Sequence, residues 1–151
     1  MNPQASKRQP RVFTVEEANA TLPLVRAIAN DLATRSQEVV ELRQRLELLS
    51  EGRDAKSGDP YSDELDQMQK ELARQDEQLR EYLSELTDLG VISRVGPDNT
   101  MNVVDFPAVL DGRKVYLCWQ LGEPEVAHWH DRDAGFDGRR SLATTAAGTD
   151  S

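Results

Sequence analysis

The residues of this 151-residue chain that could do chemistry lie close together in its last third. Cys118 is the only cysteine, and His128 and His130 are the only histidines. A thiolate and neutral imidazoles are ligands that Zn²⁺ prefers, and a carboxylate such as Asp131 or Asp133 can supply a fourth. The spacing therefore suggests a zinc site, structural or catalytic, if the fold brings these side chains together.

The elements that must position these residues are two antiparallel strands joined by a turn. Residues 113–119 (RKVYLCW) and a last strand over Glu125–His130 have strand-like composition, and the Gly122-Glu123-Pro124 run between them is typical of a turn. If the three turn residues stay unpaired, Cys118 lies across from His128 and Tyr116 lies across from His130. The metal hypothesis depends on this register, because a slip of one residue would separate the cysteine and the histidines onto opposite faces.

The same register assigns one face of this hairpin to the core. The expected core face is apolar and comprises Val115, Leu117, Trp119, Leu121, Ala127 and Trp129. The opposite face comprises Tyr116, Cys118, Gln120, Val126, His128 and His130. A buried, inert cysteine beside hydrogen-bonded histidines is the alternative interpretation. A catalytic thiolate–imidazole pair of Cys118 and His128, oriented by Asp133, is disfavoured because a cysteine in an apolar strand usually packs in the core.

A second group of residues could bind a ligand on the same side. The segment Asp133–Ser141 (DAGFDGRRS) is rich in turn residues, and Arg139 could hold a carboxylate or phosphate through two hydrogen bonds, with Glu123 nearby. The alternative is that Arg139 pairs with Glu123 or with Asp133 or Asp137 and fixes the loop to the sheet. The chain has no Walker or dinucleotide-binding pattern.

Upstream of the sheet, residues 13–89 predict a helical hairpin. Thr14 and Glu17 form the T-x-x-E pattern of a capping box at the start of a helix. Pro23 either kinks one helix or separates a short helix, ending near residues 19–21, from a long one. We expect the second arrangement, because proline is tolerated in the first turn of a helix.

Apolar residues between Val25 and Leu89 recur at alternating spacings of three and four in two segments, which is typical of a coiled coil. A turn-rich linker near 50–61 separates the segments, and we expect Ser62 and Gly90 to start and end the second helix. The seam includes Leu32, Val39, Leu42, Leu72, Leu79 and Leu86. Arg35 and Gln75 interrupt it, and such a polar residue either fixes the register or turns outward to solvent.

After Gly90 the apolar period changes to two. Strands are expected at residues 91–95 (VISRV) and 101–106 (MNVVDF), and Asp111-Gly112 predicts a tight hairpin turn into RKVYLCW. Pro107 indicates a sheet edge or a bulge. The predicted fold class is α+β, with a long antiparallel helical hairpin followed by a small antiparallel β-meander.

The chain is predicted to form one domain in four parts. We expect a flexible basic arm over 1–12, the helical hairpin over 13–89, the sheet and closing loop over 90–140, and a disordered tail over 141–151. The basic arm, with Lys7, Arg8 and Arg11, is too short to indicate nucleic-acid binding.

Composition excludes several classes of protein. The net charge of −9 argues against binding to nucleic acid or to anionic membranes. No apolar run is long enough to span a membrane, and the N-terminus has no apolar segment of a secretory signal. A single cysteine excludes an internal disulfide and fits a reducing compartment, so a cytoplasmic location is expected.

Three segments together resemble a family of small prokaryotic proteins, the domain-of-unknown-function family number 2203. They are residues 13–25 (FTVEEANATLPLV), 104–123 (VDFPAVLDGRKVYLCWQLGE) and 129–140 (WHDRDAGFDGRR). The resemblance covers most of the chain and implies no reaction, cofactor or catalytic residue. The positions that match the family's motifs are Cys118, Trp119, Gly122, Glu123, Trp129, His130, Asp133, Gly135, Phe136, Gly138 and Arg139.

Two functions follow as expectations. The first is a non-enzymatic scaffold or protein-interaction module that acts through its helical hairpin, as a homo-oligomer or with a protein partner. The alternative is a binding protein or an enzyme with a site for a metal such as zinc, or for a small ligand, around Cys118, His128 and His130.

Overall fold

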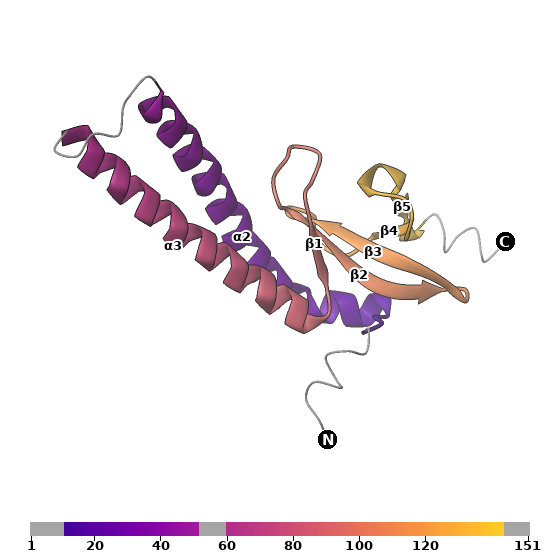
Figure 1. Ribbon diagram of the computed structural model, residues 1–151. Coiled ribbons are helices and arrows are strands. Elements are labelled where there is room, and N and C mark those ends of the chain that lie inside the picture. Colours follow the sequence, from indigo (N-terminus) through magenta and orange to yellow (C-terminus); the bar gives the residue numbers. More distant parts are fainter. Residues whose placement is uncertain (1–10, 52–59, 144–151) are drawn as a thin grey trace.

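The computed structural model describes residues 11–51 and 60–143 and has an α+β fold (Figure 1). Two long helices form a hairpin, and a five-stranded antiparallel sheet follows with its strands in chain order. The elements are α2 (Val15–Ser50), α3 (Pro60–Leu89), β1 (Ile92–Arg94), β2 (Val103–Leu110), β3 (Arg113–Gln120), β4 (His128–Asp131), the 3₁₀ helix η1 (Phe136–Gly138) and β5 (Arg140–Ser141). The predicted fold class is therefore confirmed.

Helix α2 begins with the predicted capping box. The Thr14 hydroxyl accepts a hydrogen bond from the Glu17 N–H at 3.0 Å, and the Glu17 carboxylate accepts one from the Thr14 N–H at 2.9 Å. The expected division into two helices near Pro23 was wrong, because one helix runs through the proline. Leu22 and Val25, on either side of it, are both buried in the same core, which holds the two parts in one helix. Figure 1 shows the first turns of α2 at an angle to the rest, as expected where proline removes a backbone hydrogen bond.

Helix α3 begins at Pro60, two residues before the predicted cap at Ser62. The fixed φ angle of proline suits the first helical position, so the helix starts there instead. Its end at Gly90 is as predicted. Gly90 has a positive φ of 93°, and the N–H groups of Gly90 and Val91 donate to the carbonyls of Thr87 and Leu86 at 2.9 and 3.3 Å. This pattern satisfies two of the last helical carbonyls.

The tight turn at Asp111-Gly112 joins β2 to β3 as predicted, with positive φ angles of 52° and 77°. Pro107 lies in β2 beyond the residues that pair with β1, and its carbonyl accepts a hydrogen bond of 2.7 Å from the N–H of Phe13. Backbone N–H and C=O of one strand residue point to the same side, so the missing N–H of Pro107 faces a local sheet edge. The register of β3 with β4 is the predicted one, with Cys118 opposite His128 and Tyr116 opposite His130.

The last strand differs from the prediction of Glu125–His130, because β4 begins only at His128. The chain before it leaves the sheet to meet α2, where the Val126 N–H donates to the Asn19 side-chain oxygen at 2.7 Å. Strand alternation does not hold in that loop. As a result Val126, expected on the site face, is 2% exposed in the core.

Strand β5 and helix η1 were not predicted from the sequence. In β5, Ser141 pairs with His128, so the sheet extends one residue past the expected boundary at 140. The predicted N-terminal arm lies outside the described residues up to residue 10, as do the predicted linker over 52–59 and the predicted tail from 144. None of the helices described in residues 11–51 and 60–143 is both long and apolar enough to cross a lipid bilayer.

The core lies between the first half of α2 and one face of the sheet (Figure 1). Buried aromatic and aliphatic side chains of β2, β3 and β4 meet Ala18, Leu22, Val25, Ala29 and Leu32 of α2 there. Phe13 joins this core through an edge-to-face contact with Phe106, with ring centroids 5.2 Å apart. The outer parts of α2 and α3 continue side by side away from the sheet as an arm (Figure 1).

Candidate functional site

The face of the sheet away from the core carries a buried cluster of three side chains that could ligate a metal. Asp105 of β2, Cys118 of β3 and His130 of β4 each offer one ligand atom, and these atoms lie within 4.8 Å of one another. Asp105 and Cys118 are directly opposite in the β2–β3 register, and His130 is diagonal to Cys118. The exposed fractions are 0% for Asp105 and Cys118 and 2% for His130.

Hydrogen bonds fix the orientation of the His130 ring. Its Nδ1 lies 2.8 Å from the carbonyl oxygen of Asp131, and its Nε2 lies 3.1 Å from Oδ2 of Asp105. A carbonyl oxygen only accepts, so Nδ1 carries a proton. The contact between Nε2 and Oδ2 needs one proton, which either the imidazole or the carboxyl group carries.

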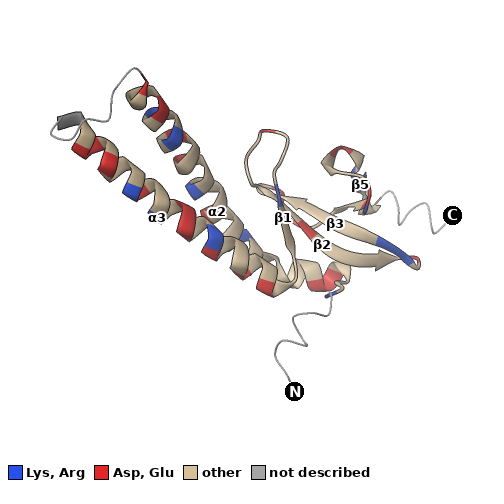
Figure 2. Cartoon of the chain, in the orientation of Figure 1, with Lys and Arg blue, Asp and Glu red and all other residues tan. Residues whose placement is uncertain are grey.

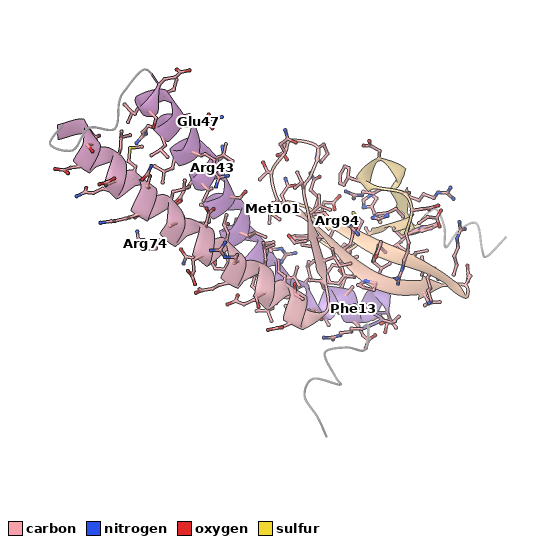
Figure 3. The ribbon with its side chains drawn as sticks, in the orientation of Figure 1. Phe13, Arg43, Glu47, Arg74, Arg94 and Met101 are labelled. Atoms are coloured by element: carbon pink, nitrogen blue, oxygen red, sulfur yellow. The ribbon has the colours of Figure 1, made fainter. Side chains whose placement is uncertain are left out.

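Arg94 of β1 places a positive charge beside the Asp105 carboxylate of this cluster. Its Nε donates to Oδ2 of Asp105 at 2.6 Å, while its side chain is 44% exposed. The Arg94 guanidinium also lies 5.3 Å from the centroid of the Tyr116 ring, and the Arg132 guanidinium lies 4.7 Å from it. Figure 3 shows Arg94 at the sheet, apart from the arm that carries Arg43, Glu47 and Arg74. The second carboxylate oxygen of Asp105, Oδ1, is buried and has no hydrogen-bond partner.

The Cys118 thiol is protonated at neutral pH. Burial raises its pKa above the ordinary value of 9.0, and the negative charge of the neighbouring Asp105 carboxylate raises it further. Nucleophilic cysteines need the opposite environment, one that stabilises the thiolate. The environment of Cys118 therefore disfavours the catalytic thiolate–imidazole pair.

His128 and Glu123 form a separate group beside this cluster. His128 lies across from Cys118, but its Nδ1 lies 3.6 Å from Oε2 of Glu123 and makes no hydrogen bond. Glu123 is held by the Arg139 Nη2 donor at 2.5 Å and by the backbone N–H of Gln120 at 2.7 Å. The structure thus shows the intramolecular pairing of Arg139 with Glu123, which fixes the closing loop to the sheet.

Two predicted ligand candidates lie away from the cluster. Asp133 is exposed in the turn after β4. Asp131 pairs through Oδ1 with Nη2 of Arg113 at 2.8 Å. Of the candidates named from the sequence, the structure brings together Cys118 and His130.

Sequence reasoning missed Asp105 and Arg94, although a signal for Asp105 was present. The two-residue turn at Asp111-Gly112 fixes the β2–β3 register, and that register places Asp105 opposite Cys118. An acidic residue inside the apolar run VVDFPAVL is itself unusual, because a buried carboxylate needs partners.

The second candidate site is the arm formed by α2 and α3. The seam residues named from the sequence all face inward to some degree: Leu32, Val39 and Leu86 are buried, and Leu42, Leu72 and Leu79 are half-buried. Arg35 does not bond across the seam, because its guanidinium pairs with Glu38 one turn along α2 at 3.0 Å. Gln75 likewise donates to Glu71 of its own helix at 2.9 Å. The Arg35 side chain, 30% exposed, agrees with the interpretation in which a polar seam residue turns outward, whereas Oε1 of Gln75 is buried and has no hydrogen-bond partner.

The arm is rich in acidic residues (Figure 2). Residues 14–89 contain 18 acidic and 9 basic residues, and acidic positions recur along α3. One ion pair joins the two helices near the middle of the arm, from Nη2 of Arg43 to Oδ2 of Asp76 at 3.2 Å.

Comparison with known proteins gives one family. No curated protein and no solved structure matches the chain. The model of a family described as uncharacterized conserved protein (DUF2203) matches residues 11–142, which include both helices and the whole sheet. The chain therefore belongs to the DUF2203 family, as its motifs had suggested.

Proposed function

We propose that the protein is a non-enzymatic interaction module whose arm pairs with the arm of a second copy of this chain. The observation that carries this proposal is the loss of burial along the outer half of the hairpin. On α2 the last buried residue is Val39, and on α3 the only buried residue among those described is Leu86.

Apolar side chains nevertheless continue to the tip of the arm. The half-buried ones of the outer half are Leu42, Leu46, Leu49, Leu65, Met68 and Leu72. Val40 and Leu48 of α2 are more exposed, at 49% and 72%. Helices in water owe most of their stability to tertiary packing of an apolar face. In a hairpin of two helices, the apolar stripe of each helix is covered on one side only.

Packing against the hairpin of a second chain would bury the apolar side chains that one hairpin leaves half-exposed. Four helices packed around a shared core bury stripes that two helices leave half-exposed. A dimer with twofold symmetry brings the same patch of each copy together, so Leu42, Leu46 and Leu49 of both chains would lie in one interface.

The acidic surface sets the salt dependence of this association. Two arms of like charge repel at low ionic strength, and salt screens that repulsion. Self-association through the apolar stripe therefore strengthens as salt is added. A basic protein partner of the arm would show the opposite dependence.

The experiment is size-exclusion chromatography with light scattering on the full chain. We expect a particle of twice the 16.9 kDa chain mass for the wild type and of one chain mass for Leu46→Glu. Leu46 is half-buried within one chain, and the helical circular dichroism of Leu46→Glu checks that the arm still forms. Val109→Glu is the matched control, because Val109 is 45% exposed on the sheet and outside the arm, and it stays dimeric.

A wild type that stays monomeric at every concentration and salt level contradicts the proposal. A Leu46→Glu variant that still forms the dimer contradicts it as well, because glutamates of both chains would then be buried in the interface without cost. Association that weakens with salt would instead indicate a charge-driven contact.

A further inference from the structure

We propose that Asp105, Cys118 and His130 bind a zinc ion. This site is independent of the arm, since its residues lie on the sheet face away from the core. The ligand set also differs from the one suggested by the sequence, because Asp105 takes the place that His128 and Asp133 held there.

The types and positions of the three side chains suit Zn²⁺. Sulfur, imidazole nitrogen and carboxylate oxygen are its common protein ligands, at about 2.0–2.3 Å. Tetrahedral ligand atoms at those distances lie about 3.5 Å from one another. The three ligand atoms here already lie within 4.8 Å of one another, so small side-chain movements bring them into coordination. Three protein ligands leave a fourth position for water or another small ligand.

The His130 ring is held in the orientation that a metal ligand needs. Its Nδ1 proton is donated to the Asp131 carbonyl at 2.8 Å, which aims Nε2 at the other two residues. Metal-bound histidines almost always have such a hydrogen bond from their other nitrogen. The carbonyl thus fixes the ring before any metal arrives.

Asp105 provides an oxygen that nothing else in the described chain uses. Its Oδ1 is fully buried and has no partner, although its Oδ2 is held by Arg94 and His130. A buried acceptor without a partner is costly, and a cation bound at Oδ1 would remove that cost. Arg94 can stay on Oδ2 or turn to solvent, because its side chain is 44% exposed.

Zinc binding at this site must release protons. The Cys118 thiol loses its proton to become a thiolate ligand, and the proton of the hydrogen bond between Nε2 of His130 and Oδ2 of Asp105 also leaves. About two protons therefore leave for each zinc ion bound, and both go to the buffer. The bound ion replaces the proton on sulfur as the partner of the buried thiolate.

The test is binding of zinc and of cobalt(II) to the purified, untagged chain under reducing conditions. We expect one zinc per chain by mass spectrometry of the metal content after dialysis. Cobalt(II) in the same site should show a thiolate-to-cobalt charge-transfer band. Cys118→Ser should lose that band and bind zinc at least about tenfold more weakly, because loss of an outer-shell partner alone costs about 10- to 100-fold.

The matched controls are His128→Ala and Asp133→Asn, which alter the residues named from the sequence but not the cluster. Both variants should keep one zinc and the cobalt band. Zinc retained without a thiolate band, or equally by Cys118→Ser, overturns the proposal and indicates adventitious binding to surface acids. A wild type that binds neither metal overturns it outright, and this result does not depend on whether any variant folds.

Discussion

Asp105→Asn is expected to cost the fold about 3 kcal/mol of unfolding free energy. The substitution keeps the shape of the side chain and removes its charge. Asp105 is completely buried, and Oδ2 faces the Arg94 Nε at 2.6 Å and the His130 Nε2 at 3.1 Å. The neutral amide of asparagine replaces the carboxyl group that the buried His130 ring contacts through Nε2.

The two contacts contribute unequally. Arg94 is 44% exposed and can turn to water, so its share is that of a surface ion pair, about 0–1 kcal/mol. His130 is 2% exposed, so its ring cannot turn to water in the folded protein. A hydrogen bond to a charged group is worth about 1.5–3 kcal/mol, and breaking a buried pair costs about 3–5 kcal/mol. The sum is dominated by His130, which gives the expected value of about 3 kcal/mol.

Urea unfolding with a chelator present measures this cost, followed by the fluorescence of Trp119 and Trp129. The chelator separates the ion pair from any bound metal. Asp133→Asn is the control: Asp133 is exposed, and surface substitutions of this kind stay within about 0.5 kcal/mol. A loss below about 1 kcal/mol for Asp105→Asn would refute a stabilising role of the buried contact between Asp105 and His130.

Four further outcomes follow from the structure. Thr14→Ala removes the capping box and should lower the unfolding free energy by about 1 kcal/mol, measured in urea. Leu86→Ala, at the only buried position described in α3, should cost about 2–5 kcal/mol in the same assay, and a value near zero would place α3 outside the core. Folding raises the pKa of Cys118 above its ordinary value of 9.0, so its stabilisation is full at lower pH and is lost as pH rises past that value. The stability difference between wild type and Cys118→Ala should then fall above pH 9.0 by up to about 1.4 kcal/mol per pH unit, and a flat difference would contradict the burial of the thiol. Pro23→Ala should restore one backbone hydrogen bond and leave helical circular dichroism equal or higher, whereas a loss of helix would mean that the bend at Pro23 is needed for packing on the sheet.

The hairpin and the strand register could be predicted from the sequence because each rests on a repeating pattern. Heptad spacing puts seam side chains on one helix face whatever else the chain does. The predicted β3–β4 register is also confirmed, although β4 begins at His128 and not at Glu125. The pairing of Cys118 with His128 depended only on the number of residues between them.

The errors arose where tertiary contacts override local pattern. Pro23 does not end α2, because Leu22 and Val25 are buried in one core on both sides of it. Val126 leaves the strand pattern because its N–H binds Asn19, 107 residues earlier in the chain. No local rule in the sequence contains these long-range contacts.

The candidate site was half-predicted for a related reason. Cys118 and His130 were found by residue type, since the chain has few cysteines and histidines. Asp105 is one of 27 acidic residues, so its residue type alone does not mark it as a candidate ligand. Its role emerges only when the β2–β3 and β3–β4 registers are combined across three strands.

Pairing of the arms is tested most directly by sedimentation equilibrium of the wild-type chain over a range of concentrations at low and high salt. The arm surface predicts a reversible equilibrium between one and two chains of 16.9 kDa, shifted towards the dimer by high salt. A single species of one chain mass under all conditions would contradict the account, and so would a dimer that dissociates as salt is added.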